Sequence, residues 1–198
     1  MKSRKLYRRS LAPILVCALF ASSLLIGNAA PRRDPLTEKE ADLVREAQAL
    51  DKRTEVFVKV VERRLLALTD PNAAASKQAE KDVEMWGELP KGTRAELLSD
   101  IANILDEAVT NIEDVGARNA KSRLIPKSLR ILAQASTRFL PQLTALREQL
   151  KDEREMGALE KVLDNLQEIV TASNNLPAET VETGKQKKAK SENRRDEK

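Results

Sequence analysis

The chain has 198 residues, with 35 basic and 31 acidic side chains, one cysteine and no histidine. The lack of histidine excludes Ser-His and Cys-His nucleophilic chemistry, His-ligated haem and the Glu-x-x-His ligands of di-iron bundles. Only 3% of the residues are aromatic, so we expect no stacking platform for nucleic-acid bases. We therefore predict a protein without enzyme activity, metal or cofactor, although chemistry based on carboxylates alone stays open.

The N-terminal segment has the order of an export signal peptide over residues 1–29. Five basic residues precede an apolar run from Leu11 to Ile26, and small residues follow, so we expect cleavage after Ala29. Because membrane-spanning helices need roughly 17–25 apolar residues, an uncleaved anchor at residues 11–26 is the alternative. Arg8-Arg9 leaves a twin-arginine route open beside the general secretory one. The predicted location is the periplasm or the outside of the cell.

Removal of this signal changes the charge argument. Residues 1–30 contain five basic and no acidic side chains, so the rest of the chain carries 30 basic residues against 31 acidic ones. The basic character of the full sequence is therefore no argument for nucleic-acid binding. Cys17 lies in the predicted signal, which leaves no cysteine for a disulfide in an exported domain.

An extended leader at residues 30–36 precedes the first predicted helix. Thr37 and Glu40 form a capping box, and apolar residues follow at steps of three and four as far as Leu68. Asp70-Pro71 ends the pattern, so we expect one long helix over residues 37–69.

Four more helical segments come after it in the sequence. A short one is predicted between residues 71 and 87, with Trp86 against the core, and a capping box at Thr93 and Glu96 starts the next. Another begins near Pro126 and continues through Pro141 with a kink. The last begins after a turn around residues 151–155 and ends near Asn174.

Together these segments predict an all-α fold, an antiparallel helical bundle of about four main helices plus one short helix over residues 37–175. The pattern fits either a compact bundle or extended hairpins, and either a monomer or a dimer. Residues 176–198 are charged and almost free of large apolar side chains, which predicts a disordered C-terminal tail.

Charge is segregated between two neighbouring segments. Residues 94–115 carry six acids and one base, whereas residues 117–147 carry seven bases and no acid. One interpretation is that two antiparallel neighbours neutralise each other. The other is a basic face for an anionic partner, with six candidate residues: Arg118, Lys121, Arg123, Lys127, Arg130 and Arg138.

The sequence thus predicts an exported, non-catalytic interaction protein of the cell envelope or periplasm. It would bind a protein partner, or a second copy of itself, through a helical face. The alternative is salt-sensitive binding of an anionic polymer or membrane surface through the basic 118–147 stretch and the tail. Nucleic acid is not an expected partner, and membrane contact through the N-terminal segment is expected only if that segment stays uncleaved.

Overall fold

The computed structural model describes residues 33–70, 72–73 and 77–177, without the side chains of residues 77–80. The predicted signal peptide, its cleavage site after Ala29 and nearly all of the predicted tail lie outside the described residues. Within the described part of the chain, no helix combines the length and the apolar character needed to cross a membrane.

The described chain is all α-helical, as predicted. Four helices are long: α3 (Leu50–Thr69), α5 (Arg94–Arg118), α6 (Leu124–Leu146) and α7 (Glu153–Asn174). Two are short: α2 (Glu38–Glu46) and α4 (Lys77–Trp86). A 3-10 turn, η3 (Arg147–Gln149), links α6 to the turn before α7.

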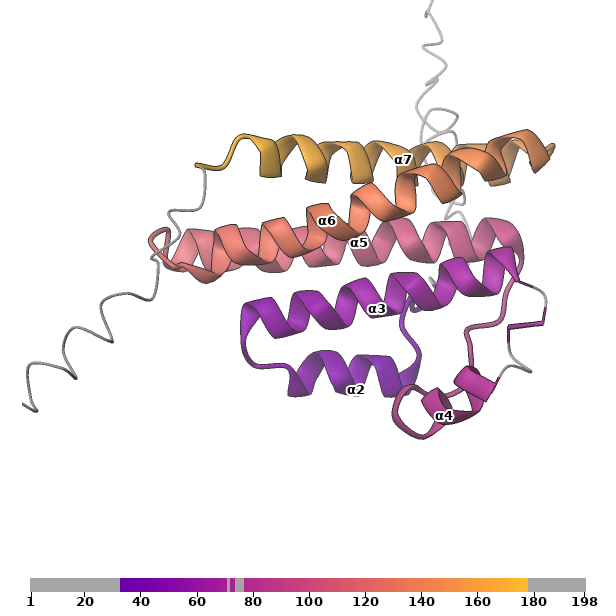
Figure 1. Ribbon diagram of the computed structural model, residues 1–198, viewed down its shortest axis with the longest axis horizontal. Helices are drawn as coiled ribbons and strands as arrows, with labels where there is room; N and C mark the ends of the chain where they lie inside the picture. The colour runs from indigo at the N-terminus through magenta and orange to yellow at the C-terminus, as the bar shows by residue number, and fades with distance from the viewer. Residues whose placement is uncertain (1–32, 71, 74–76, 178–198) are drawn as a thin grey trace, which may run out of the picture. The chain divides into compact units, whose positions relative to one another are not determined.

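The four long helices form a bundle whose order in space differs from the order in sequence. α3 and α7 lie on opposite sides, and α5 and α6 each pack against both of them (Figure 1). Consecutive long helices run in opposite directions, as predicted. α5 and α6 lie diagonally across the bundle and pack against each other much less than either packs against α7.

The core consists of aliphatic side chains from all four long helices together with Phe57 and Phe139. Fully or almost fully buried examples from each are Val60, Leu98, Leu132 and Leu166. Burial of one such side chain is worth roughly 1.5–3 kcal/mol, so this core accounts for the bundle without a disulfide. Pro141 lies inside α6, which continues past it to Leu146, as predicted.

The predicted helix starts are confirmed. The capping boxes of Thr37 with Glu40 and of Thr93 with Glu96 are both present, at α2 and α5. The Asp152 side chain accepts hydrogen bonds from two backbone N–H groups at the start of α7, in the turn predicted around residues 151–155. These local signals therefore set the register of three helices.

The prediction of one helix over residues 37–69 is wrong, because the helix is interrupted at residues 47–49. Ala47 and Ala49 adopt ψ angles of 87° and 136°. Arg53 Nε donates to the Ala47 carbonyl oxygen at 3.0 Å and satisfies one acceptor at the break. The interruption lets α2 turn back and lie along α3, which makes two short helices instead of the one predicted.

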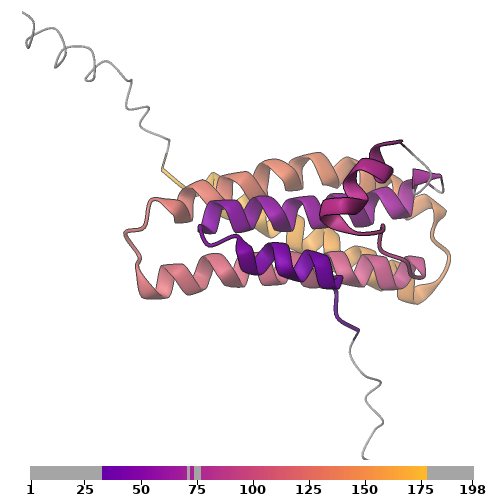
Figure 2. The same cartoon turned by 90° about the horizontal axis from the view of Figure 1, so that it is seen from below.

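The two short helices form an outer layer on the α3 side of the bundle. Figure 2, seen from below, shows α2 and α4 in front of the four long helices. α2 packs against α3, and α4 packs against α2. We call α2 and α4 together the outer layer.

Candidate functional site

A buried ionic cluster joins the outer layer to the bundle. The Glu40 carboxylate of α2 accepts hydrogen bonds from Arg63 Nε at 3.0 Å and from Arg64 Nη1 and Nη2 at 2.9 and 2.7 Å. The exposed fractions of Glu40, Arg63 and Arg64 are 0%, 4% and 1%. We call these three residues the Glu40 cluster.

The Glu40 carboxyl is ionised at neutral pH. Burial raises its pKa, but the hydrogen bond and charge of Arg64, the Thr37 backbone N–H and the Arg63 hydrogen bond together outweigh burial and lower the pKa. Two guanidinium groups therefore share one carboxylate in a site closed to solvent. Such a cluster depends on its geometry, because an unpaired charge at this depth is costly.

The cluster also fixes the C-terminal end of α4. Arg63 Nη2 donates to three successive backbone carbonyls, those of Trp86 at 3.2 Å, Gly87 at 3.0 Å and Glu88 at 2.6 Å. Lys39 Nζ donates to two more, those of Val83 at 3.2 Å and Glu84 at 3.0 Å. The last carbonyls of a helix lack partners within it, and the two cations donate to those of Glu84 and Trp86; Val83 also accepts from the Gly87 backbone N–H at 3.0 Å, and Gly87 and Glu88 follow the helix.

Trp86 covers the edge of the core, as predicted. Its ring is half-buried and packs against the core cluster, and the Arg63 guanidinium carbon lies 6.0 Å from the ring centroid. Gly87 follows with φ of 75°, and a Cβ there would lie 3.3 Å from Lys39 Cδ. The chain therefore turns away from α4 at a position that favours glycine.

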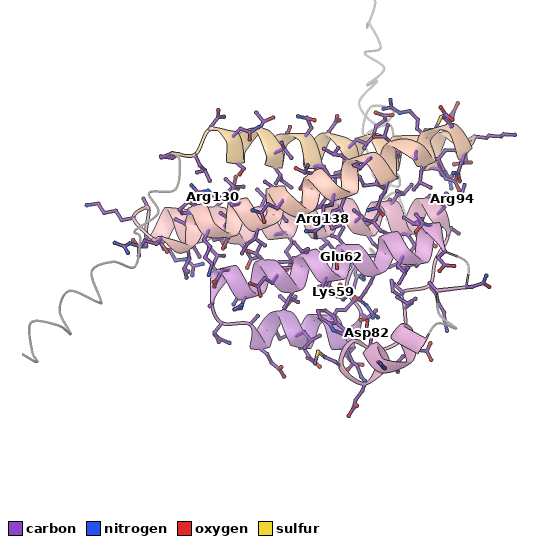
Figure 3. The ribbon with its side chains drawn as sticks, in the orientation of Figure 1. Lys59, Glu62, Asp82, Arg94, Arg130 and Arg138 are labelled. Atoms are coloured by element: carbon purple, nitrogen blue, oxygen red, sulfur yellow. The ribbon has the colours of Figure 1, made fainter. Side chains whose placement is uncertain are left out.

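A hollow lies between α3 and α4 beside this cluster. It encloses about 230 Å³, and seven residues line it: Lys59, Glu62, Arg63, Leu66, Asp82, Gly87 and Leu89. Figure 3 labels Lys59, Glu62 and Asp82 at this side of the molecule. A second hollow, of about 580 Å³, lies by the end of α3 and the loop before α5, and Leu89 lines both.

Two exposed large apolar side chains, Leu66 and Val83, lie at these hollows. Among the residues with described side chains, four are exposed: Leu66 at 40%, Val83 at 40%, Met85 at 62% and Met156 at 39%. Leu66 and Val83 each line one of the two hollows, and Met85 lies on another face of α4. We call the group of Leu66, Val83 and Leu89, with the two hollows, the α3–α4 surface.

Three of the six predicted basic-face residues are engaged by neighbouring elements. Lys127 Nζ lies 2.6 Å from Asp51 Oδ2 on α3, and its hydrogen bond is the main cause that lowers the pKa of Asp51. Arg138 Nη2 lies 3.0 Å from Glu62 Oε1, also on α3. Arg130 Nη2 donates to the Pro177 carbonyl oxygen at 2.7 Å, beyond the end of α7.

The other three lie at the end of the bundle where α5 passes into α6. Arg118 Nε donates to the Asp114 carbonyl oxygen at 3.0 Å, within the last turn of α5. Lys121 and Arg123 are exposed in the loop that follows. The structure thus places Lys127 and Arg138 along the α3–α6 seam, Arg130 against the segment after α7, and the other three residues at one end of the bundle.

The charge segregation has a different geometry from the one expected of antiparallel neighbours. α5 and α6 lie on a diagonal, so the α6 cations Lys127 and Arg138 reach acids of α3. On α5, Asp106 Oδ2 lies 2.9 Å from Lys161 Nζ, which belongs to α7. Neutralisation therefore runs around the ring of helices and not directly between α5 and α6.

No group of three or more His, Cys, Asp or Glu side chains that could hold a metal ion occurs within the described residues. The chain was also compared with family models, curated proteins and solved structures, and none of them matches it. Functional inference therefore rests on the surfaces of the bundle and of the outer layer.

Proposed function

We propose that this protein is an exported, non-catalytic helical interaction protein of the cell envelope or periplasm. Its partner is another protein or a second copy of the same chain, and the contact is made by the α3–α4 surface. The observation that carries this proposal is the gathering of exposed Leu66 and Val83 beside two hollows. Single exposed apolar residues are ordinary, whereas apolar groups in hollows are typical of docking sites.

The way α4 is attached supports the same proposal. Arg63 and Lys39 donate hydrogen bonds to backbone carbonyls at the end of α4 and in the residue after it. The helix is therefore held in place without using all of its apolar side chains. Charged groups of Lys59, Glu62 and Asp82 line the hollow beside Leu66. An apolar centre with a polar rim is the usual composition of a protein interface.

A matched pair of substitutions tests this proposal. Leu66→Lys places a charge on the α3–α4 surface, and Met156→Lys makes the same kind of change on α7 at a nearly equal exposed fraction, 39% against 40%. We expect Leu66→Lys to weaken self-association in sedimentation velocity, or crosslinking to an envelope partner, by roughly tenfold or more. Met156→Lys should leave both unchanged. Equal effects of the two variants would contradict the proposal.

The export part of the proposal rests on the sequence of residues 1–29 and is tested separately. Fractionation of the native host, followed by an intact mass measurement, should give a protein in the soluble envelope fraction that begins near Ala30. A full-length mass in the membrane fraction would instead make residues 11–26 an anchor.

The alternative function is salt-sensitive binding of an anionic polymer or membrane surface. Exposed Lys121 and Arg123 at the end of the bundle favour it, whereas Lys127 and Arg138 already pair with acids. Charge reversal of Lys121 and Arg123 should then weaken retention on heparin or on anionic vesicles, with a strong dependence on salt. Unchanged retention would remove this alternative.

A further inference from the structure

A groove follows the seam between α5 and α7, away from the α3–α4 surface. It encloses about 400 Å³, and its ten lining residues divide equally between apolar and polar. The apolar ones are Leu105, Val109, Leu129, Ile169 and Ala172. The polar ones are Asp106, Thr110, Glu113, Asn165 and Glu168. We call this the α5–α7 groove.

The rim of this groove is acidic. Three of its lining residues are carboxylates and none is basic. The Asp106 carboxylate already has partners, because it accepts hydrogen bonds from Lys161 Nζ at 2.9 Å and from Asn165 Nδ2 at 2.7 Å. The side chains of Glu113 and Glu168 are exposed and make no hydrogen bond or ion pair within the described part of the chain. Two carboxylates, one on each helix, are thus available to an incoming cation.

The fold explains why this seam stays acidic. α6 carries three basic residues, Lys127, Arg130 and Arg138, and no acidic one, but it lies diagonally opposite α5. Its Lys127 and Arg138 pair with α3, and Arg147, which directly follows α6, pairs with Glu160 of α7. The α5–α7 seam is therefore formed by the two long helices in which acidic side chains outnumber basic ones.

The spacing of the lining residues matches a third helix laid along the groove. α5 lines it at positions 105, 106, 109, 110 and 113, and α7 at positions 165, 168, 169 and 172, which are successive turns of one helical face. The pairs Arg94–Glu155 and Lys161–Asp106 show that the two helices run in parallel. At 1.5 Å per residue the groove extends for about 12 Å, which is roughly two helical turns.

We propose that the α5–α7 groove binds a cationic amphipathic helix of a partner protein. Its apolar stripe, at steps of three and four, would lie on Val109, Leu129 and Ala172, and flanking Lys or Arg side chains would pair with Glu113 and Glu168. Docking of an amphipathic helix into an apolar groove is a common recognition mode, and complementary charge on the rim selects the sign of the partner. This site is separate from the α3–α4 surface and goes beyond the proposed function.

A peptide titration tests the charge and the shape of the occupant. The probe is a fluorescent peptide of about 18 residues, five helical turns, with a leucine stripe flanked by lysines. Two companions replace every lysine with glutamate, or introduce a central proline that breaks the helix. By fluorescence anisotropy only the lysine helix should bind the purified protein. Absence of binding, or equal binding of the proline peptide, would overturn the proposal.

Two matched double variants then locate the site. Glu113→Lys with Glu168→Lys reverses the rim, and Glu46→Lys with Glu148→Lys makes the same charge change on exposed residues outside the groove. The rim variant should weaken binding of the lysine peptide by roughly tenfold or more, and the control variant should weaken it by less than about twofold. Equal losses would mean that only the overall charge matters and would overturn the proposal.

A third variant tests the apolar floor without changing charge. Ala172 is exposed near the end of α7, so Ala172→Trp fills the groove with little risk to folding. This variant should weaken binding of the lysine peptide even at high salt, where the charged rim contributes less to the affinity. If the rim variant changes the sedimentation coefficient without peptide, the occupant is a second copy of the chain, and the proposal of a partner helix fails. Leu66→Lys should not affect peptide binding, which separates this test from that of the proposed function.

Discussion

The four-helix bundle and the outer layer are attached by different physical means. The bundle buries aliphatic side chains from α3, α5, α6 and α7 in one continuous core. In the outer layer, Val44 and Trp86 pack against the edge of this core, and the rest of the attachment is polar: the Glu40 cluster and the backbone carbonyls that accept from Arg63 and Lys39. The first kind of attachment is non-directional and hardly depends on pH, whereas the second depends on one carboxylate and its geometry.

This difference means that the two regions can lose stability separately. A cooperative core unfolds as a unit, but elements with little apolar contact open locally at lower free energy. α4 carries an exposed part of the α3–α4 surface, so the less stable region is also the one to which we assign binding. Substitution, hydrogen exchange and acid titration can each test whether the two regions separate.

The Glu40→Gln substitution should have the largest effect. It leaves the buried guanidinium groups of Arg63 and Arg64 without a counter-charge, and breaking a buried pair in this way costs about 3–5 kcal/mol. We expect the lower end of that range, because Arg63 keeps its carbonyl acceptors. Urea unfolding followed by circular dichroism measures the loss. Glu38→Gln, at an exposed position of α2, is the matched control and should cost little.

Hydrogen exchange on Glu40→Gln shows where the loss occurs. Amides of α2 and α4 should exchange much faster than in the native protein, while those of α5 and α7 keep their protection. A uniform loss of protection over all helices would contradict the separation of the two regions.

A core substitution should give the opposite pattern. Leu132 of α6 is fully buried, and Leu132→Ala should destabilise the protein by about 2–5 kcal/mol through lost burial and the cavity left behind. Because the core is shared by all four long helices, their amides should lose protection together in hydrogen exchange. Loss confined to α6 would show that the bundle is not one cooperative unit.

Acid should release the outer layer before it unfolds the bundle. The folded pKa of Glu40 lies below its ordinary value of 4.5, so the unfolded state takes up the proton first as pH falls. The stability that ionised Glu40 contributes is therefore full above about pH 4.5 and is lost as pH falls through its lowered folded pKa. Emission of Trp86, the one tryptophan of the chain, should change at higher pH than the helical signal in circular dichroism.

Coincident transitions of the two signals would contradict this prediction. Asp51 also has a lowered pKa, but its partner Lys127 belongs to the bundle, so its protonation should affect the helical signal. The Glu40→Gln variant should lose the early emission step.

Local signals in the sequence were sufficient for most of the helices. The two capping boxes, the continuation of α6 through Pro141 and the start of α7 near Asp152 are all found where the pattern predicted them. Each depends on residues within a few positions of one another, which is the range over which sequence patterns are informative.

The sites depend on contacts between distant residues and were missed. Neither glycine nor proline marks the break at residues 47–49, so the turn of α2 back onto α3 results from tertiary contacts. One signal was present: Arg64 is seven residues after Phe57, on the buried face of α3, where a cation needs a partner. The sequence pattern already explained its partner Glu40 as part of the capping box with Thr37, so it gave no reason to pair Glu40 with an arginine. The diagonal arrangement of α5 and α6 has no local sequence signal.

The smallest effect on stability is expected from an exposed ion pair whose distances are as short as those of the Glu40 cluster. Arg147 Nη2 lies 2.6 and 2.7 Å from the two oxygens of Glu160, but both side chains are about half exposed. Water and salt screen such a pair, so Arg147→Ala should cost only about 0–1 kcal/mol in urea unfolding. If its cost approached that of Glu40→Gln, short distances alone would explain both pairs, and burial would not be what distinguishes the outer layer from the surface of the bundle.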